Sequence, residues 1–525
     1  MNSLYILIFL ILLNFTFTFG GAIQCNTFVS SISKANITTC GSSSNDACPT
    51  ISQSIINCGL YDEITIEITA GNYSIQSETF GPITNKKITI SSSENDRYPS
   101  PFIDLSNSNS PFIEFVPSNT GTDSLTVSFY GLIFGGIKKS SVLLSNGSGI
   151  IDLSVVNCEF FNGKFSSYGS AFTFLNGSTT PKVNSVVTIS RSTFYASNSN
   201  EYGGFLYSLN LPIQFTINQS DFQGSNIKGG GAIFAISGGF LSVTNTNFKG
   251  LETKYPFFLQ KKNGTKSTTA DFTFEEVTLN GITDGFGILV IGDKNTTIQI
   301  KSCTFINGIN FSPVFIQGTG QSTIESCTFT NNSNSLSNMG SSAAITISSS
   351  SSTINNCNFL NNRARFGGAI ATDSCDPQGV TITNSIFQGN DAEYDGGSIF
   401  NNKCNVTIKN VDFSNLPTNI STIYCESSNM AFTQTNIFEG GKLINDLSSS
   451  GIVCDLNPCN IIINSNQSVI CQSSSNNNNN DDGLSTGKKV LIAFGVIAAF
   501  IIIITIVVVI FRSIKRNKRY KPVGY

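Results

Sequence analysis

The chain has 525 residues, of which only 12% are charged, with 30 Lys and Arg against 33 Asp and Glu and no histidine. The absence of histidine excludes Ser/His/Asp hydrolysis, Cys/His proteolysis and any other mechanism with a histidine acid or base. Without the six cations near the C-terminus, 24 Lys and Arg face 33 Asp and Glu, and this formal charge of −9 argues against a nucleic-acid ligand.

A secretory signal peptide is predicted over residues 1–22. An apolar run from Leu4 to Leu13 is followed by the small residues Gly20, Gly21 and Ala22, as at a signal cleavage site. No Lys or Arg precedes the run, so an uncleaved signal anchor is the alternative.

Residues 23–65 are predicted to form a cysteine-rich N-terminal cap. Its four cysteines are Cys25, Cys40, Cys48 and Cys58, which allow three disulfide connectivities. The 14 cysteines of the chain and its Asn-x-Ser/Thr sequons indicate an oxidising, secretory compartment. Twelve sequons follow the signal segment and are the predicted N-glycosylation sites: Asn36, Asn72, Asn146, Asn176, Asn218, Asn263, Asn295, Asn310, Asn331, Asn405, Asn419 and Asn466.

Residues 66–445 repeat a phrase about every 26 residues, typified by Val380–Phe387 and Val406–Phe413. The phenylalanines that close the phrases lie 24 to 34 residues apart, with Leu279 in one position: Phe134, Phe160, Phe194, Phe222, Phe248, Phe305, Phe329, Phe359, Phe387, Phe413 and Phe438. Such a period indicates a solenoid whose units bury their apolar faces only by stacking.

Within each phrase the inward-facing positions recur at every second residue, and this alternation shifts by one residue once. The shift falls between Ile300 and Cys303 in one phrase and between Ile382 and Ser385 in another. The shift predicts a corner between two short strands. Asparagine often occupies the corner and tolerates left-handed backbone: Asn157, Asn245, Asn356, Asn384 and Asn410. The sequence therefore predicts an all-β, parallel β-helix of about twelve coils.

Two sets of cysteines fall within the coils. Cys375, Cys404 and Cys425 each precede the first strand of a coil, so neighbours among them are expected to bridge stacked loops. An internal position of the phrase holds Cys158, Cys303, Cys327 and Cys357. The rung spacing permits a Cys303–Cys327 disulfide, and the alternative is a column of buried thiols.

The phrases resemble those of the right-handed parallel β-helix, or pectin-lyase-like, superfamily, and in particular polymorphic outer membrane protein repeats, which pair FxxN with GGA[ILV]. Phe329–Asn332, Phe359–Asn362 and Phe387–Asn390 match FxxN. Gly230–Ile233 and Gly367–Ile370 match GGA[ILV]. These glycines are predicted to be corners with positive φ, and close approach of a ligand is the alternative.

The resemblance implies two chemistries for an enzyme, an inverting carboxylate pair or Ca²⁺-bound acids with an Arg or Lys base. The paired Asp of polygalacturonase-like hydrolases occurs only at Asp481–Asp482, in the linker. The weak lyase-like candidates are Arg363, Arg365, Asp391, Glu393 and Asp395. Because Arg363 and Asp391, and likewise Arg365 and Glu393, share offsets from their coil's Phe, ion pairs between stacked rungs are the preferred interpretation.

Residues 446–489 are predicted to hold a cysteine-containing C-terminal cap and an Asn-rich stalk. The 22 uncharged residues 490–511 are long enough for one transmembrane α-helix. Residues 512–525 form a basic tail, which the positive-inside rule places in the cytoplasm.

These features predict a type I single-pass glycoprotein of the plasma membrane or another secretory-pathway membrane, with an extracellular ectodomain. Its predicted role is non-catalytic recognition or adhesion toward a glycan or a cell-surface protein, without a metal or cofactor. A membrane-tethered polysaccharide lyase or hydrolase is the first alternative, and Ca²⁺ belongs to the lyase form alone. A structural surface component is the second alternative.

Overall fold

The computed structural model describes residues 24–471 apart from short gaps. The gaps are residues 36–38, 76–83, 94–99, 109, 118–122, 137–140, 148, 162–163, 166–170, 176–184, 196–197, 200–203, 210, 225–231, 252–254, 262–270, 336–341, 416–420, 434–435, 438–451, 455–458 and 464–466. The predicted signal peptide, transmembrane segment and tail lie outside the described residues. No helix within the described part of the chain is both long and apolar enough to span a membrane.

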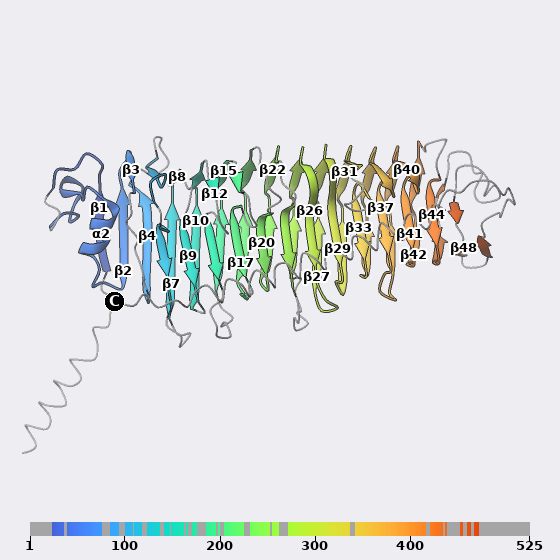
Figure 1. The fold of residues 1–525 in the computed structure, drawn as a ribbon, viewed down its shortest axis with the longest axis horizontal. Coiled ribbons are helices and arrows are strands. Elements are labelled where there is room, and N and C mark those ends of the chain that lie inside the picture. The colour runs from blue at the N-terminus through green and yellow to red at the C-terminus, as the bar shows by residue number, and fades with distance from the viewer. Residues whose placement is uncertain are drawn as a thin grey trace, which may run out of the picture. The chain divides into compact units, whose positions relative to one another are not determined.

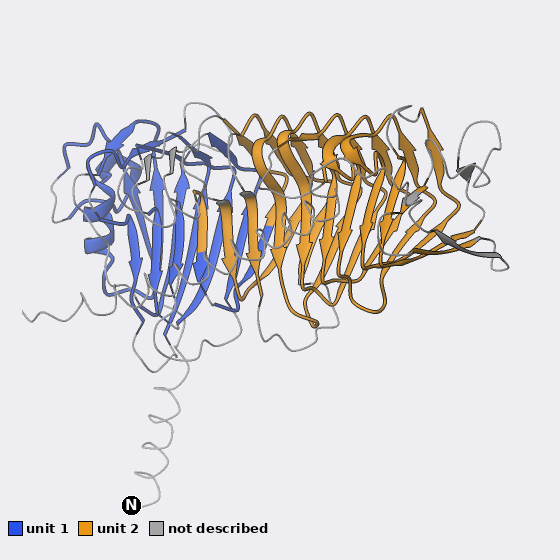
Figure 2. Ribbon diagram, turned by 45° about the vertical axis from the view of Figure 1, so that its right-hand side comes forward, with its two compact units in different colours: residues 1–195, 208–216 blue, residues 196–207, 217–525 orange. Residues whose placement is uncertain are grey.

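The chain divides into two compact units (Figure 2). Unit 1 comprises residues 1–195 and 208–216, and unit 2 comprises residues 196–207 and 217–525. In each unit, successive turns of a parallel β-solenoid contribute strands to three sheets, called A, B and C here (Figure 1). The described residues form an all-β parallel solenoid and contribute 14 strands to sheet B and 13 strands to sheet C.

In unit 1, the strands run in chain order along each sheet. Sheet A holds β1 (Gln24–Val29), β2 (Glu63–Ile68), β4 (Lys86–Ser92), β7 (Ser124–Tyr130), β10 (Ile150–Val156) and β14 (Val186–Ser190). Sheet B holds β3 (Asn72–Ser74), β5 (Phe102–Asp104), β8 (Ile133–Gly135), β11 (Glu159–Phe160) and β15 (Thr193–Tyr195). Sheet C holds β6 (Ile113–Phe115), β9 (Leu143–Asn146) and β13 (Phe172–Leu175).

In unit 2, the same order continues in each sheet. Sheet A holds β21 (Phe240–Thr244), β24 (Phe272–Glu275), β27 (Thr297–Lys301), β30 (Gln321–Glu325), β34 (Ser352–Asn355), β38 (Val380–Thr383), β42 (Asn405–Lys409), β45 (Asn429–Thr433), β48 (Cys459–Ile463) and β49 (Gln467–Cys471). Sheet B holds β19 (Asp221–Gln223), β22 (Asn247–Lys249), β25 (Thr278–Asn280), β28 (Thr304–Ile306), β31 (Thr328–Thr330), β35 (Asn358–Leu360), β39 (Ile386–Gln388), β43 (Asp412–Ser414) and β46 (Asn436–Ile437).

Sheet C of unit 2 holds β20 (Ala232–Ser237), β23 (Tyr255–Gln260), β26 (Thr283–Ile291), β29 (Ile309–Gln317), β33 (Ile345–Ser348), β37 (Ile370–Asp373), β41 (Ile399–Asn402), β44 (Ile423–Glu426) and β47 (Ile452–Cys454). A separate short sheet pairs β32 (Ser333–Asn334), β36 (Arg363–Phe366) and β40 (Asp391–Asp395). β12 (Lys164–Phe165) and β16 (Asn198–Ser199) form a two-stranded sheet. β17 (Leu206–Leu209) belongs to sheet C and β18 (Gln214–Asn218) to sheet A.

The corner between sheets A and B has the predicted left-handed backbone. Asparagine occupies it with φ near +50° at Asn157, Asn245, Asn356, Asn384 and Asn410. The amide Nδ2 of Asn410 donates to Asn384 Oδ1 (2.8 Å). The shift of alternation therefore marks a real change of sheet, because the chain must turn where its buried face switches.

The phenylalanine that closes each phrase lies in the core of sheet B. Phe305, Phe329, Phe359, Phe387 and Phe413 stack ring on ring from turn to turn, with centroids 4.6–5.1 Å apart. All five are at most 1% exposed. The regular period of the sequence thus corresponds to one aromatic column.

The asparagine of each FxxN phrase forms a second, polar column inside unit 2. Asn362 Nδ2 donates to Asn390 Oδ1 (3.0 Å) and to the Phe329 carbonyl (2.9 Å). Its own Oδ1 accepts from Asn332 Nδ2 (3.0 Å) and from the Asn332 main-chain N–H (3.2 Å). All three asparagines are buried, so the amides satisfy main-chain groups where the chain leaves sheet B.

The four internal cysteines are free, buried thiols, which confirms the alternative of a thiol column over a Cys303–Cys327 disulfide. Each thiol donates to the carbonyl two residues earlier, as Cys303 Sγ does to Lys301 O (3.1 Å). Ser385 occupies the same position in its turn and makes the equivalent bond to Thr383 O (2.8 Å). The position therefore requires a small donor, which a thiol or a hydroxyl supplies.

The N-terminal region combines strand, helix and disulfides. β1 pairs in parallel with β2, so sheet A begins before the predicted cap ends. The cap also holds a 3₁₀ turn at Ser44–Asp46 and the helix α2 (Ile51–Asn57), whose N-cap Thr50 Oγ1 accepts from Gln53 N (3.1 Å). The disulfides Cys25–Cys58 and Cys40–Cys48 select one of the three connectivities.

At the other end, strands extend past residue 445. β48 continues sheet A in parallel with β45, and β49 returns antiparallel to β48. The predicted bridging of stacked loops occurs once, at Cys375–Cys404, whereas Cys425 pairs with Cys459.

Candidate functional site

The predicted charged cluster lies on the short sheet of unit 2. β36 and β40 are parallel neighbours, and Arg363 is in register with Asp391. Arg363 Nε lies 3.4 Å from Asp391 Oδ2, and Arg365 Nε lies 3.7 Å from Glu393 Oε2. Both predicted ion pairs are therefore present between adjacent turns.

Aromatic contacts fix the position of Arg365 more closely. Its guanidinium lies 5.1 Å from the centre of the Tyr394 ring, and its Nη2 donates to the Tyr394 hydroxyl (3.1 Å). Tyr394 stacks on Phe366 (5.0 Å), which in turn packs on Phe400 of sheet C (5.4 Å). The short sheet is thus attached to the outer face of sheet C.

The last acid of the cluster, Asp395, is held by a different group. Ser421 Oγ donates to Asp395 Oδ1 (3.3 Å) and accepts from the main-chain N–H of Gly396 (3.0 Å). Asp395 is opposite Phe366 in the register, one residue out of step with the preceding pairs. The three acids therefore do not converge on one point within the short sheet.

Glycines follow both strands of the short sheet, and those after β36 belong to the predicted Gly367–Ile370 phrase. Gly367 and Gly396 have φ of +61° and +69°. A Cβ at Gly367 would lie 2.4 Å from the Ile370 carbonyl, and one at Gly368 would lie 2.2 Å from the Gly397 carbonyl. The glycines are tight corners packed against protein backbone, which confirms the structural interpretation. Gly230 and Gly231 lie outside the described residues.

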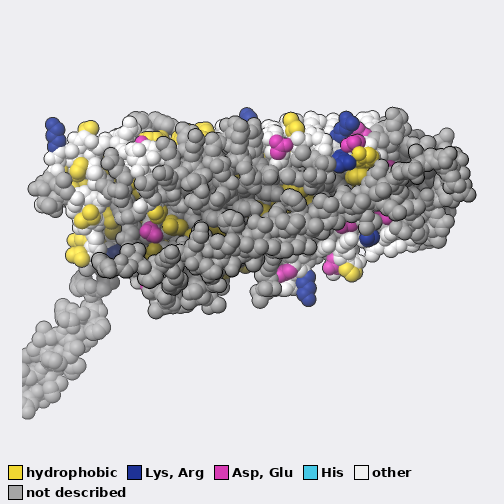
Figure 3. Space-filling model, in the orientation of Figure 1, with side chains coloured by type: hydrophobic (Ala, Val, Ile, Leu, Met, Phe, Trp, Pro, Cys, Tyr) yellow, Lys and Arg dark blue, Asp and Glu magenta, His cyan; other side chains and the backbone are white. Residues whose placement is uncertain are grey.

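Basic and acidic side chains adjoin one another in Figure 3 over the part of unit 2 that contains β40. The side chains of Arg363 and Glu393 are 69% and 51% exposed, whereas those of Arg365 and Asp391 are 27% and 33% exposed. Solvent screening at this exposure makes each ion pair weak. The cluster can register one turn on the next, and its outer surface is available to a partner.

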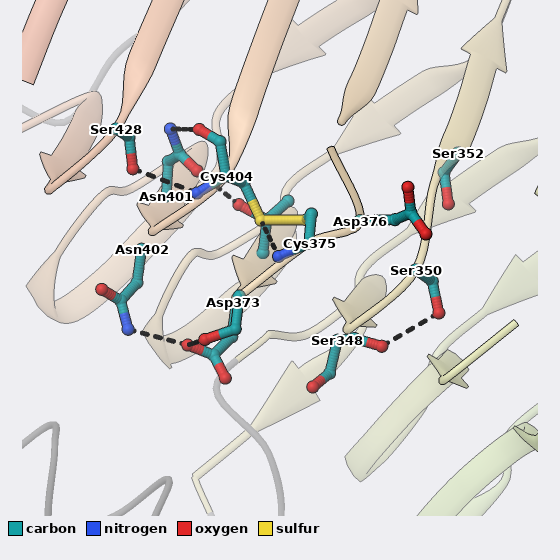
Figure 4. Close-up of a disulfide and its surroundings, with 12 residues drawn as sticks. Ser348, Ser350, Ser352, Asp373, Cys375, Asp376, Asn401, Asn402, Cys404 and Ser428 are labelled. Atoms are coloured by element: carbon teal, nitrogen blue, oxygen red, sulfur yellow. Dashed lines mark hydrogen bonds between the residues drawn. A yellow bond between two sulfur atoms is a disulfide. The ribbon is translucent and has the colours of Figure 1, made fainter. Parts of the chain in front are cut away.

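A second polar group, which the sequence analysis missed, lies on the outer face of sheet C. Asp373, Asn402 and Glu426 end successive strands β37, β41 and β44 and are in register. Asn402 Nδ2 donates to Asp373 Oδ1 (2.7 Å) beside the Cys375–Cys404 disulfide (Figure 4). The available signal was spacing, because Asp373 and Asn402 each stand two residues before a bridged cysteine.

Burial raises the pKa of the Asp373 carboxyl above its usual range, although hydrogen bonds from Ser374 and Asn402 oppose the shift. A carboxyl with a raised pKa can act as a general acid only if substrate reaches it. Asn402 and Glu426 are each 3% exposed, and the Tyr424 hydroxyl donates to Glu426 Oε2 (3.3 Å). Asp373, Asn402 and Glu426 thus form a column of polar side chains that is buried at Asn402 and Glu426 and half-buried at Asp373.

No group of three or more His, Cys, Asp or Glu side chains with metal-binding geometry occurs among the residues that the structure describes. Seven of the predicted glycosylation sites are described. Asn72, Asn331 and Asn405 are exposed, and Asn146, Asn218, Asn295 and Asn310 are half-buried. Asn36, Asn176, Asn263, Asn419 and Asn466 lie outside the described residues.

The fold agrees with a family model for a right-handed β-helix region, which matches residues 263–392. This match supports a right-handed parallel solenoid and includes β36 and the first two residues of β40. No curated protein matches the chain.

Solved structures with a similar fold include two lyases and a tailspike. The chain is similar to a PL6 family polysaccharide lyase from Pseudopedobacter saltans at 10% identity, covering 77% of this chain and 89% of that chain, with a TM-score of 0.32. It is similar to bacteriophage CBA120 tailspike protein 3 at 12% identity, covering 87% of this chain and 65% of that chain, with a TM-score of 0.39. It is similar to a mannuronic acid specific polysaccharide family 6 lyase from human gut microbiota at 11% identity, covering 76% of this chain and 81% of that chain, with a TM-score of 0.30. These values concern the fold alone.

Proposed function

We propose that the chain is a cell-surface recognition or adhesion protein that presents a non-catalytic β-helix to a glycan or a cell-surface protein. One observation carries the proposal. The two candidate bases, Arg363 and Arg365, are each bound to an acid of the next turn, and Arg365 also to Tyr394. A lyase base must instead be free to take a proton from substrate.

The proposal includes the membrane topology predicted from the sequence. Residues 1–22 would direct secretion, residues 490–511 would anchor the chain, and residues 512–525 would face the cytoplasm. Occupied sequons would make the ectodomain a glycoprotein. The FxxN and GGA phrases also support a closer relationship to polymorphic outer membrane protein repeats, since both phrases have defined structural tasks in unit 2.

The test uses cells that display the full chain. Labelled neutral and acidic polysaccharides are added with and without Ca²⁺, and both retention on the cells and new reducing ends are measured. We expect retention without new reducing ends. Cells that display an Arg363→Gln/Arg365→Gln variant are compared with cells that display Lys249→Gln/Lys403→Gln, which removes two exposed cations outside the short sheet and outside sheet A.

Two outcomes would overturn the proposal. Release of reducing ends by the wild type that disappears only in the arginine variant would make the cluster an active site of a tethered lyase. Failure of the displayed chain to retain any polysaccharide, or to bind any other cell, would favour a structural surface component.

A further inference from the structure

A column of threonines runs along the outer face of sheet A in unit 2. Thr323, Thr353, Thr381 and Thr407 are in register on four successive strands, β30, β34, β38 and β42. Their neighbours in each strand are buried isoleucines or other core residues, so the threonines face outward. Upstream, Gln299 and Thr273 extend the same column through β27 and β24.

The hydroxyls of this threonine column are not used within the described structure. Thr323, Thr353 and Thr381 make no side-chain hydrogen bond to another described residue. The neighbouring outward column behaves differently. Thr383 Oγ1 donates to Asn355 Oδ1 (2.9 Å), and Asn355 Nδ2 donates to Glu325 Oε1 (3.4 Å).

The charge that flanks the column on β30 is paired within the protein. Glu325 lies 3.9 Å from Lys301 of the preceding strand. Between β30 and β38, the outward positions of sheet A carry no arginine and no aromatic side chain, although these residues dominate most protein–protein hot spots. The column is therefore a neutral, hydroxyl-rich surface and suits neither a nucleic acid nor a typical protein partner.

Because the threonines recur once in every turn, they suit a ligand that is itself a regular polymer. Successive threonines are about 4.8 Å apart, a spacing close to the length of one sugar ring in an extended polysaccharide. Each threonine offers one methyl group, one donor and two acceptor lone pairs. Its β-branched side chain has few rotamers to lose on binding. A polymer with one sugar per turn would meet the same contacts at every step.

We infer that the threonine column binds an extended, neutral polysaccharide chain lying parallel to the stacking direction of sheet A. The inference rests on the proposed function, because it names the ligand class and the surface for glycan recognition. Thr407 also completes the sequon of Asn405, so an occupied Asn405 would border the site at β42. The binding surface is therefore assigned to β30, β34 and β38, with Gln299 as its upstream extension.

The test compares two matched variants of the full chain displayed on cells. Thr353→Val/Thr381→Val removes two hydroxyls from the column and keeps the β-branched shape, which suits a half-buried, outward-facing strand position. Thr304→Val/Thr328→Val makes the same change on the outer face of sheet B, where Thr304 and Thr328 are also in register. None of these four threonines belongs to a sequon. Thr353→Ser/Thr381→Ser retains the hydroxyls and serves as the second variant if the valine pair fails to reach the surface.

The probes are labelled cellohexaose and chitohexaose, their disaccharides, and an anionic alginate oligomer. We expect the wild type to bind a neutral hexamer more tightly than its disaccharide, since the longer chain spans more turns. The sheet A valine pair should weaken this binding roughly tenfold or more, from two lost hydrogen bonds. The serine pair and the sheet B pair should bind within about twofold of the wild type.

The outcomes separate this inference from the proposed function. Equal binding by the sheet A valine pair and the wild type, or binding of the anionic oligomer alone, would contradict the assignment of the threonine column as the binding surface. The proposed function of glycan recognition would remain. If the displayed chain retained no glycan and bound no cell, both this inference and the proposed function would be wrong. Loss of binding in the serine pair would also contradict the inference, because that pair keeps the hydroxyls.

Discussion

Asn332, Asn362 and Asn390 show how one buried side chain serves two turns of the solenoid. Asn332 and Asn362 each donate to the next asparagine. All three amides donate to a main-chain carbonyl of the preceding turn, as Asn390 Nδ2 does to Phe359 O (2.8 Å). Parallel strands leave such groups unpaired where the chain turns between sheets. A buried group without a partner costs roughly 1–3 kcal/mol. The FxxN phrase is thus a solution to main-chain hydrogen bonding.

Replacing Asn362 with Ala should lower the free energy of unfolding by about 2–4 kcal/mol, because the Phe329 carbonyl and the Asn332 amide lose their partners. Asn361→Gly is the matched control. Asn361 is exposed with φ of +53°, and Gly389 occupies the equivalent position one turn later. Denaturant unfolding of both variants measures the difference. Equal stability of the two variants would contradict the role given to the buried amide.

Cysteine at the internal position acts as a small hydrogen-bond donor. Burial raises the pKa of Cys158 to about 12, and the hydrogen bond with Cys303 raises the pKa of Cys327. The neutral thiols are therefore poor nucleophiles. Their chemistry is that of the serines found at the same position in other turns.

Asp373 should give the protein a measurable pH dependence. Its pKa is raised in the folded state, so the folded protein binds the proton more tightly than the unfolded chain does. Stability from this group is present below the unfolded pKa of about 4 and is lost as pH rises through the folded pKa. Wild type and Asp373→Asn are unfolded from about pH 3.5 to pH 7. The stability of the wild type should fall relative to the variant as pH rises, and parallel profiles would refute the shift.

At the scale of elements, the short sheet shows how charges set the register between turns. β36 and β40 pair over few residues and include a shift of register after Ala364. The Arg363–Asp391 pair occupies a regular position before that shift, whereas the Arg365–Glu393 pair lies within it. Opposite charges favour this alignment over its one-residue alternatives, because a slip would bring Arg365 away from Glu393.

A double-mutant cycle should give Arg363 and Asp391 a coupling of only about 0.2–1 kcal/mol, because the arginine is largely exposed. The cycle uses Arg363→Ala, Asp391→Ala and the double variant, with unfolding followed at low and high salt. Coupling should shrink in high salt. A coupling of several kcal/mol that ignores salt would instead indicate a desolvated pair with a role beyond registration.

At the scale of the whole molecule, both described ends of the chain carry devices that limit strand exposure. β1 is overlaid by the disulfide-linked segment that contains α2, and β48 is paired by the antiparallel β49. Open parallel edges invite addition of further strands.

Disruption of β49 should therefore cause self-association. Proline at Val469 and Ile470, which face Ile461 and Asn460 of β48, removes main-chain donors from the covering strand and keeps Ser468 of the Asn466 sequon. Size-exclusion chromatography of the detergent-solubilised full chain should show concentration-dependent oligomers. Proline at Ser474, outside β49, is the control. A monomeric double variant would show that the edge of β48 has another protection.

Much of the fold was predictable because a solenoid converts sequence period into contact. The Phe column, the asparagine corners and the glycine corners all repeat at the same offset in each turn. The Arg363–Asp391 ion pair was predictable for the same reason. Parallel strands in register place equal offsets one rung apart, so no tertiary information is required.

The Asp373–Asn402–Glu426 column was not predictable in the same way. These residues follow sheet C, and the segments between sheets B and C vary in length from turn to turn. Their offsets from the closing phenylalanine therefore differ, which hides the shared register. The same variation hid the contact between Phe366 and Phe400.

The sequence by itself determined the repeating strand pattern, its two-faced burial and the charges that pair between rungs, because these depend on local alternation and a constant period. Only the tertiary structure decided which cysteines pair, which thiols stay free and which asparagines form the buried column. Those outcomes depend on how far each connecting segment carries the chain before it rejoins the stack. That distance is a property of the folded turns and is not encoded in the period.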